Sequence, residues 1–252
     1  MAALPFVNNQ GVRIHYETVG SGSALVLHHG TFGSGADWAD VGYVDALKED
    51  HHLILLDSRG HGESDKPHDP AAYGLAHRTS DVLAVLDDLS IREADYFGYS
   101  LGGWIGFGLA KHAPHRFNSF ILGAAHPYAE DMQPFRDYMP RSPEAVPTMV
   151  DQVFGSRITP TMRSRLLAND LKALRALTQD RESNADVLPS MTMPCLLFVG
   201  ELDPRLAKVK ECVSELPNAT FFTLPESDHI GALLRSDVVI PHIKAFLSKV
   251  RR

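Results

Sequence analysis

The sequence has few cysteines, no excess of basic residues and no long hydrophobic run. Two of its 252 residues are cysteines, Cys195 in an apolar run and Cys212 in a helical pattern, so we expect reduced core residues rather than a disulfide scaffold. Lys and Arg number 24 against 31 Asp and Glu, and the formal charge of −7 argues against a nucleic-acid partner. No run of about 18 apolar residues occurs, and the N-terminus lacks the basic start of a signal peptide. We therefore expect no membrane span and a cytoplasmic location.

The sequence also lacks the motifs of metal and nucleotide sites. Its 13 histidines form no H-E-x-x-H or H-x-H-x-D-H string, and the adjacent pairs at 28–29 and 51–52 would point to opposite faces of a strand. Neither a P-loop nor a strand-linked G-x-G-x-x-G string occurs. We therefore expect neither a metal ion nor a cofactor.

The sequence does contain a regular alternation of strand-like and helix-like segments. With 44% hydrophobic and 22% charged residues, the chain is long enough for one large domain with a sizeable core. The alternation predicts an α/β fold with a mostly parallel sheet and helices on both faces. Strands are expected at Val12–Val19, Ala24–His28, His52–Asp57, Ala94–Tyr99, Ser119–Ala124, Cys195–Val199 and Thr220–Leu224. Helices are expected at 35–49, 75–89, Leu101–His112, Arg205–Glu215 and near Asp237–Val250.

One long stretch interrupts this alternation. Residues 126–190 are rich in proline, include helix-like segments at 162–168 and 171–177, and contain no readable strand. The simplest interpretation is a helical insertion between two core strands, forming a lid or cap. The core domain is then expected to comprise residues 1–125 and 191–252.

The sharpest motif is Gly98-Tyr-Ser-Leu-Gly102, a G-x-S-x-G string between a predicted strand and a predicted helix. A nucleophile elbow requires strand, turn and helix in this order, because the serine backbone is strained and small neighbours avoid a clash. Ser100 is therefore the candidate nucleophile. The alternative is an ordinary glycine-rich turn.

A serine hydroxyl needs a base, and the base needs an acceptor that fixes its tautomer. Asp203 and His229 each directly follow one of the last two predicted strands, so both should lie at the same edge of the sheet as Ser100. The chain order Ser, Asp, His is that of hydrolases with a strand-turn-helix elbow. The alternatives are a helix N-cap for Asp203, before Pro204, and a surface turn position for His229.

An oxyanion hole would complete this site. Its two N–H donors come from the residue after the nucleophile and from a loop after an earlier strand. Leu101 meets the first condition, and Thr31 is the candidate for the second, with Phe32 as its alternative. Gly30 would let the loop backbone approach closely, and His29 is expected to make a structural hydrogen bond.

Taken in order, these elements resemble the α/β-hydrolase superfamily. The segment Asp57-Ser-Arg-Gly-His-Gly-Glu-Ser64 is similar to that family's D-x-R-G-x-G-x-S turn and stands between the predicted oxyanion loop and the elbow. The resemblance implies an eight-stranded, mostly parallel sheet with a cap over the active site. It also implies a structural role for Asp57, Arg59 and Gly60.

Within the superfamily, the residues favour some branches over others. Ser100 argues against haloalkane dehalogenases and epoxide hydrolases, which use an aspartate nucleophile, and Tyr99 stands where carbon–carbon bond hydrolases often carry asparagine. The resemblance therefore implies a cofactor-independent serine hydrolase that cleaves small carboxylic esters or lactones through an acyl-enzyme. The alternatives are a carbon–carbon bond hydrolase or lyase on the same fold, and a ligand-binding or signalling protein with slow turnover.

Selectivity is expected to depend on the lid, because its aromatic and flexible side chains are suited to lining an apolar pocket over Ser100. The alternative is that they form the lid's own core. The candidate pocket residues are Phe32, Tyr99, Trp104, His126, Tyr128, Met132 and Phe154, with Phe135 and Tyr138 from the same segment. The expected partner is a small-molecule ester or lactone, and the sequence leaves a homodimer open.

Overall fold

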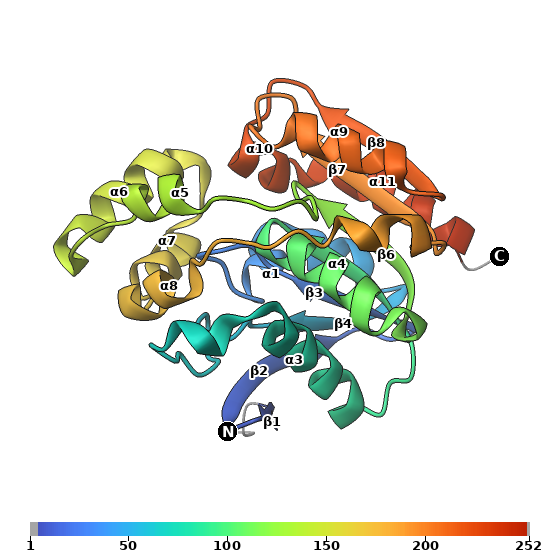
Figure 1. Cartoon of the computed structure of the whole chain (residues 1–252), viewed down its shortest axis with the longest axis horizontal. Coiled ribbons are helices and arrows are strands. Elements are labelled where there is room, and N and C mark those ends of the chain that lie inside the picture. Colours follow the sequence, from blue (N-terminus) through green and yellow to red (C-terminus); the bar gives the residue numbers. More distant parts are fainter. Residues whose placement is uncertain (1–4, 251–252) are drawn as a thin grey trace.

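An eight-stranded sheet forms the centre of the computed structural model, which describes residues 5–250 (Figure 1). The spatial order is β1-β2-β4-β3-β5-β6-β7-β8. β2 is antiparallel to both β1 and β4, and all other neighbours are parallel. The strands are β1 (Phe6–Asn9), β2 (Val12–Val19), β3 (Ser23–His28), β4 (His51–Leu56), β5 (Ala94–Tyr99), β6 (Phe117–Gly123), β7 (Cys195–Gly200) and β8 (Ala219–Leu224). The predicted fold class is confirmed; residues 1–4 and 251–252 of the predicted core domain lie outside the described residues.

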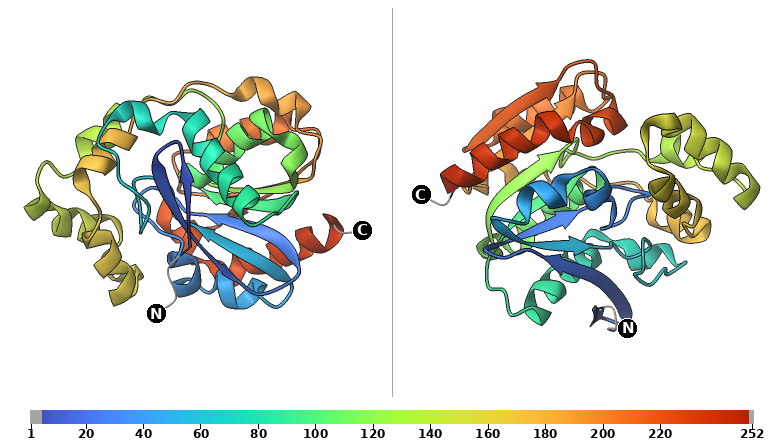
Figure 2. Two further views of the ribbon diagram at one scale, coloured as in Figure 1. Left: turned by 90° about the horizontal axis from the view of Figure 1, so that it is seen from below. Right: turned by 180° about the vertical axis from the view of Figure 1, so that it is seen from behind.

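Helices cover both faces of the sheet. α2 packs against α11 on one face, and α3 packs against α4 on the other, as the two views in Figure 2 show. The α-helices are α1 (Asp37–Asp40), α2 (Tyr43–Leu47), α3 (Leu75–Asp88), α4 (Leu101–His112), α5 (Gln133–Tyr138), α6 (Val146–Val153), α7 (Pro160–Leu167), α8 (Leu171–Leu177), α9 (Leu206–Glu215), α10 (His229–Leu234) and α11 (Ser236–Val250). Short 3₁₀ helices are η1 (Pro70–Tyr73), η2 (Pro114–Arg116), η3 (Pro143–Ala145), η4 (Gly155–Arg157) and η5 (Ala185–Ser190).

The central strands are buried on both sides. Every residue of β5 and β7 is buried, as expected for parallel strands covered by helices on two faces. This double burial explains why β7 appears in the sequence as a continuous apolar run, and why β5 does not alternate although it contains the charged Asp95. Their carboxyl ends lead directly into the two segments that carry Ser100 and Asp203.

In the core, the prediction from the sequence and the structure differ at three places. The helix expected at 35–49 is two short helices, α1 and α2, because Gly42 between them adopts φ 88°, which ends one helix before the next begins. β1 was not predicted, since four residues at a sheet edge are too short for a clear alternation. α10 was not predicted either, since its six residues span less than two turns.

The segment 126–190 leaves the sheet after β6, returns before β7, and contains α5 to α8 gathered beside one end of the sheet (Figure 1). Its buried side chains form a cluster of their own, which includes Met149, Val150 and Leu174 and is joined by Phe32 and Tyr73 from the core. The segment's two ends are linked by an antiparallel bridge, in which Glu130 and Arg181 exchange backbone hydrogen bonds of 3.0 Å. This bridge forms a neck at the base of the helical segment.

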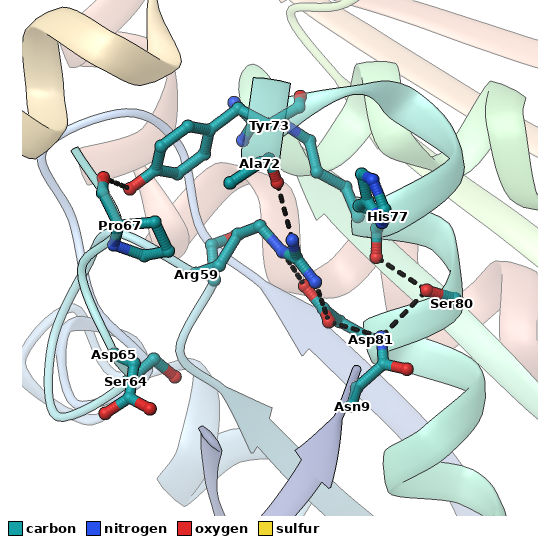
Figure 3. Close-up of polar contacts among 12 residues, drawn as sticks. Asn9, Arg59, Ser64, Asp65, Pro67, Ala72, Tyr73, His77, Ser80 and Asp81 are labelled. Atoms are coloured by element: carbon teal, nitrogen blue, oxygen red, sulfur yellow. Dashed lines mark hydrogen bonds and ion pairs between the residues drawn. The ribbon is translucent and has the colours of Figure 1, made fainter. Parts of the chain in front are cut away.

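The segment expected to be structural, 57–64, is mostly buried, and its two buried charged side chains, Asp57 and Arg59, are hydrogen-bonded to neighbouring elements. Arg59, whose side chain is 2% exposed, donates to Asp81 on α3 through Nε (2.6 Å) and Nη2 (2.7 Å), and to the carbonyl of Ala72. The amide of Asn9 on β1 donates to the same Asp81, so the network joins β1 to α3 (Figure 3). Asp57 accepts hydrogen bonds from the N–H groups of Gly35 and Glu63 and from His15. These side chains are committed to holding loops together.

Candidate active site

Ser100 lies between β5 and α4 in a strained backbone conformation, with φ 52° and ψ −107°. The strain is sustained by close packing around the turn. A Cβ on Gly98 would lie 2.3 Å from the carbonyl oxygen of Gly102, and one on Gly102 would lie 2.2 Å from that of His28. Only glycine fits at either position, which accounts for the G-x-S-x-G spacing in physical terms.

A continuous chain of hydrogen bonds joins Ser100, His229 and Asp203. His229 Nε2 lies 2.9 Å from Ser100 Oγ, and His229 Nδ1 lies 2.6 Å from Asp203 Oδ2. With Nδ1–H donating to the carboxylate, Nε2 is left to accept the serine proton. The three residues lie at the carboxyl edge of β5, β7 and β8, so the edge placement expected from the sequence holds.

The Asp203 carboxylate is completely buried and ionised. Burial acts to raise its pKa, but the hydrogen bond from His229, the nearby positive charge and the N–H of Arg205 outweigh burial and hold the pKa below its ordinary value. Oδ1 accepts that N–H at 2.8 Å while Oδ2 faces His229. Asp203 is not the N-cap of α9, since that position is Arg205; its Oδ1 instead fixes the turn before the helix while Oδ2 orients His229.

His229 is positioned from both sides. Asp228 caps α10 by accepting the N–H of Gly231 at 2.6 Å, which sets the start of the helix at His229. The hydroxyl of Tyr99 donates to the carbonyl of His229 at 2.5 Å, and the two rings lie 5.5 Å apart. Tyr99, the residue before Ser100, thus holds His229 in place.

The loop after β3 runs against the nucleophile. A Cβ on Gly30 would lie 3.2 Å from Ser100 Cβ, so the loop backbone is in contact with the elbow. In residues 5–250, the hydrogen bonds made outside regular elements include none donated by the N–H groups of Thr31, Phe32 or Leu101. These are the three donors considered from the sequence. His29 makes the expected structural bonds, through Nδ1 to the carbonyl of Gly30 and through Nε2 from the N–H of Ser58.

A cavity of about 470 Å³ opens over Ser100 and His229 between the core and the helical segment. Of the candidate pocket residues, it is lined by Phe32, Tyr99, Met132 and Phe154, with Phe135 and Tyr138. Further apolar lining that the sequence did not single out comes from Trp38, Val41, Ile158, Met162, Leu166, Ile230, Leu233 and Leu234. Its size suits a small organic molecule.

Three candidate pocket residues lie outside this cavity. Trp104 faces the neck, where its ring lies 5.0 Å from the guanidinium of Arg181. The rings of His126 and Tyr128 lie 5.7 Å apart in a tilted arrangement, and the hydroxyl of Tyr128 donates to Glu215 on α9 at 2.5 Å. Their aromatic character is used to attach the helical segment to the core, so their assignment to the pocket is corrected.

The sequence analysis missed charged residues in the cavity wall, among them Arg157, Arg181, Arg205 and Asp228. No motif marks Arg157 or Arg181, and only the position of Arg205, two residues after Asp203, could have drawn attention to it. Among residues 5–250, no group of three or more His, Cys, Asp or Glu side chains is arranged to hold a metal ion. Over the same range, every helix is too short or too polar to cross a bilayer.

Comparisons with known proteins identify the family and the fold. A family model described as alpha/beta hydrolase fold matches residues 23–184. A pimeloyl-acyl-carrier-protein methyl ester esterase of Vibrio parahaemolyticus is 26% identical over 258 residues, covering 92% of this chain and 97% of the relative. A 3-oxoadipate enol-lactonase of Acinetobacter baylyi is 34% identical over 115 residues, covering 45% of this chain and 42% of the relative. The crystal structure of an enol-lactonase from Burkholderia xenovorans superposes with a TM-score of 0.84 at 22% identity, covering 97% of this chain and 100% of that one.

Proposed function

Because this chain belongs to the alpha/beta hydrolase fold family, we propose that it is a serine hydrolase that cleaves small carboxylic esters or lactones. The observation that carries the proposal is the hydrogen-bonded chain from Ser100 through His229 to buried Asp203, whose Ser100 and His229 line a largely apolar cavity. The relatives named above as a methyl ester esterase and an enol-lactonase support the same reaction class.

The mechanism follows from the roles of these groups. Ser100 Oγ attacks the ester carbonyl while His229 Nε2 accepts its proton, and Asp203 stabilises the resulting imidazolium. The N–H groups of Thr31 and Leu101 hold the oxyanion, and His229 returns the proton to the leaving alcohol. Water, deprotonated by His229, then attacks the acyl-enzyme and releases the carboxylic acid. The sum is one ester and one water converted to one acid and one alcohol, without a cofactor.

The helical segment 126–190 acts in this proposal as a lid that shapes the acyl or alcohol site. Met132, Phe135 and Phe154 extend from it into the cavity wall opposite the elbow. A chain that leaves and re-enters a parallel sheet at its carboxyl edge stays near groups at that edge, where ligands bind in open α/β folds. Selectivity then depends on the lid and catalysis on the elbow.

The direct test is active-site labelling with a neutral fluorophosphonate, combined with turnover of a panel of p-nitrophenyl esters and simple lactones. The native protein should be labelled at Ser100, and Ser100→Ala should lose labelling and about 10³-fold or more of its turnover. Ser58→Ala is the matched control, because Ser58 also contacts a histidine but does not line the cavity. Labelling that persists in Ser100→Ala would refute the assignment.

A further inference from the structure

The carboxylates in the wall of the catalytic cavity are matched by their own partners. Asp228 accepts two hydrogen bonds from Arg157 Nη1, at 2.8 and 3.0 Å. Asp37 accepts from Arg165 at 2.7 Å. Both acidic groups of the wall are therefore hydrogen-bonded to an arginine of their own. Asp203, which does not line the cavity, lies near Arg205, whose positive charge helps to lower the pKa of its carboxyl.

Two other arginines of the same wall share a single counter-ion. Arg181 Nη1 donates to Glu130 Oε2 at 3.0 Å, and Arg205 Nη2 donates to Glu130 Oε1 at 2.6 Å. The three side chains are only 10%, 20% and 20% exposed, respectively for Arg181, Arg205 and Glu130. Within this cluster of three side chains, two guanidinium groups share one carboxylate, so the cluster itself carries one positive charge in excess where water screens it poorly. Burial, together with Arg205, lowers the pKa of Arg181 to about 10, so its guanidinium remains charged at neutral pH.

Both guanidinium groups also keep unused donors. Each carries five N–H groups, yet in the described part of the chain only one nitrogen of Arg181 and one of Arg205 has a recorded acceptor. Arg181 is held rigidly in the cavity wall, because its backbone forms the bridge to Glu130 and its guanidinium lies over the ring of Trp104. Trp104 is one helical turn from the nucleophile, since its N–H donates to the carbonyl of Ser100 at 2.9 Å. The excess charge therefore lies close to the reacting centre.

We propose that Arg181, assisted by Arg205, binds a free carboxylate of the substrate, so that the preferred substrate is an ester or lactone carrying a second, ionised carboxyl group. A planar guanidinium matches a carboxylate with two parallel hydrogen bonds, and such bonds are stronger where water is excluded. The apolar remainder of the cavity would hold the carbon chain between the two ends. This inference rests on the proposed hydrolase function for the identity of the scissile bond. For the carboxylate it rests on the position of Arg181 and Arg205 in the cavity wall, their unused donors and the single carboxylate that they share.

The competing explanation is that Arg181, Glu130 and Arg205 only clamp the neck of the helical segment to the core. The two explanations differ in what substrate charge does. A clamp would affect acidic and neutral substrates alike, whereas a carboxylate site would discriminate between them.

The experiment compares monomethyl esters of succinic, adipic and suberic acid with the corresponding methyl ester monoamides, which have the same shape without the charge. The wild-type protein should prefer the acid of each pair. Arg181→Gln should lower kcat/KM for the acids by about 10- to 100-fold, mainly through KM, and leave the amides nearly unchanged. Arg205→Gln should act in the same direction and serves as the second variant if Arg181→Gln does not fold. Arg163→Gln is the matched control, since Arg163 lies on α7, pairs with Asp151 and does not line the cavity.

Two further readouts separate this proposal from the hydrolase assignment. Free adipate should raise the Tm of the wild-type protein more than adipamide does, and Arg181→Gln should abolish the difference. Fluorophosphonate labelling of Ser100 should be the same in wild type and Arg181→Gln. Equal turnover of acids and amides, or a parallel loss on both in the variants, would overturn the carboxylate site and leave the hydrolase intact. Adipate binding without any labelling of Ser100 would instead overturn the hydrolase and support the carboxylate site.

Discussion

Among residues 5–250, two serine hydroxyls lie within hydrogen-bonding distance of a histidine ring nitrogen, and one of these pairs has the surroundings of a catalytic pair. Ser100 Oγ lies 2.9 Å from His229 Nε2, and Ser58 Oγ lies 2.5 Å from His28 Nε2. In each pair the other ring nitrogen is also hydrogen-bonded, to the Asp203 carboxylate for His229 and to the hydroxyl of Tyr96 for His28. The serine–histidine contact by itself therefore does not distinguish a candidate active site from a structural network.

The surroundings of the two serine–histidine pairs distinguish them. Ser58 and His28 are 3% and 1% exposed, and neither lines the cavity that Ser100 and His229 face. Burial, with the neighbouring His29, Arg78 and His61, lowers the pKa of His28 well below its ordinary value, so this ring resists taking up a proton. A tyrosine hydroxyl cannot stabilise an imidazolium as a carboxylate does. Access, a charged acceptor and a strained serine backbone together set the Ser100 pair apart.

The largest effect is expected when the histidine of the Ser100 pair is removed. His229→Ala should reduce kcat for ester hydrolysis by about 10⁴-fold or more, because the serine then has no base. Adding Ser100→Ala to His229→Ala should cost little more, since the residues act as one unit. Steady-state kinetics of the two single variants and the double variant measure this, and losses that multiply would contradict a shared role.

The next largest effect compares the hydrogen-bond partners of the two histidines, Asp203 for His229 and Tyr96 for His28. Asp203→Asn should lower kcat by about 10³- to 10⁴-fold, because an amide neither fixes the productive tautomer nor stabilises the imidazolium. Tyr96→Phe removes the equivalent partner of His28 and should leave kcat close to wild type. Similar kinetic losses in the two variants would show that the His28 network takes part in the reaction.

A smaller effect tests whether cavity access gives the Ser100 pair its selectivity. Phe154→Ala, in the cavity wall, should shift the preference between short and long acyl chains by about 1–3 kcal/mol. Tyr128→Ala is the control from the same helical segment, because Tyr128 faces Glu215 on α9 instead. The ratio of kcat/KM for short and long p-nitrophenyl esters measures this shift. An unchanged ratio in folded Phe154→Ala would show that the lid does not determine selectivity.

The smallest effect concerns stability and the buried His28 pair. A histidine whose folded pKa is depressed binds fewer protons than in the unfolded chain below pH 6.5, so its contribution to stability falls as the pH drops below that value. Below pH 6.5, His28→Gln should reduce the slope of the free energy of unfolding against pH by up to about 1.4 kcal/mol per pH unit. Urea unfolding between pH 5 and 8 measures the slope, with the exposed His112→Gln as control. Parallel profiles for wild type and His28→Gln would contradict the depressed pKa.

Much of the fold and of the candidate site could be predicted because the signals are local. β2, β5 and α4 begin and end where the sequence pattern places them. Two-residue alternation, short runs of mostly apolar residues and helical spacing are all patterns among neighbouring residues. Ser100 is marked by the glycines its turn requires. Asp203 and His229 could be found because parallel strands bring their following loops to one edge, so order along the chain was sufficient.

Other residues could not be placed in this way, because their roles depend on contacts across long sequence separations. Trp104 was expected in the pocket, yet the neck of the helical segment places Arg181 over its ring. Tyr128 was expected there too, and α9 places Glu215 beside its hydroxyl instead. The aromatic character of these side chains was visible in the sequence, but their direction was not.

The α/β sheet, the elbow and the three residues of the candidate triad are predictable from the sequence alone, because periodicity, turn sterics and strand order act over short stretches or through topology. The packing of distant segments, in contrast, sets which side chains of the helical segment face the cavity and which serine–histidine pair is open to it. It also brings Arg181 and Arg205 to one shared carboxylate. Those outcomes depend on how distant segments pack, and on a balance of burial and charge that exists only once they are together.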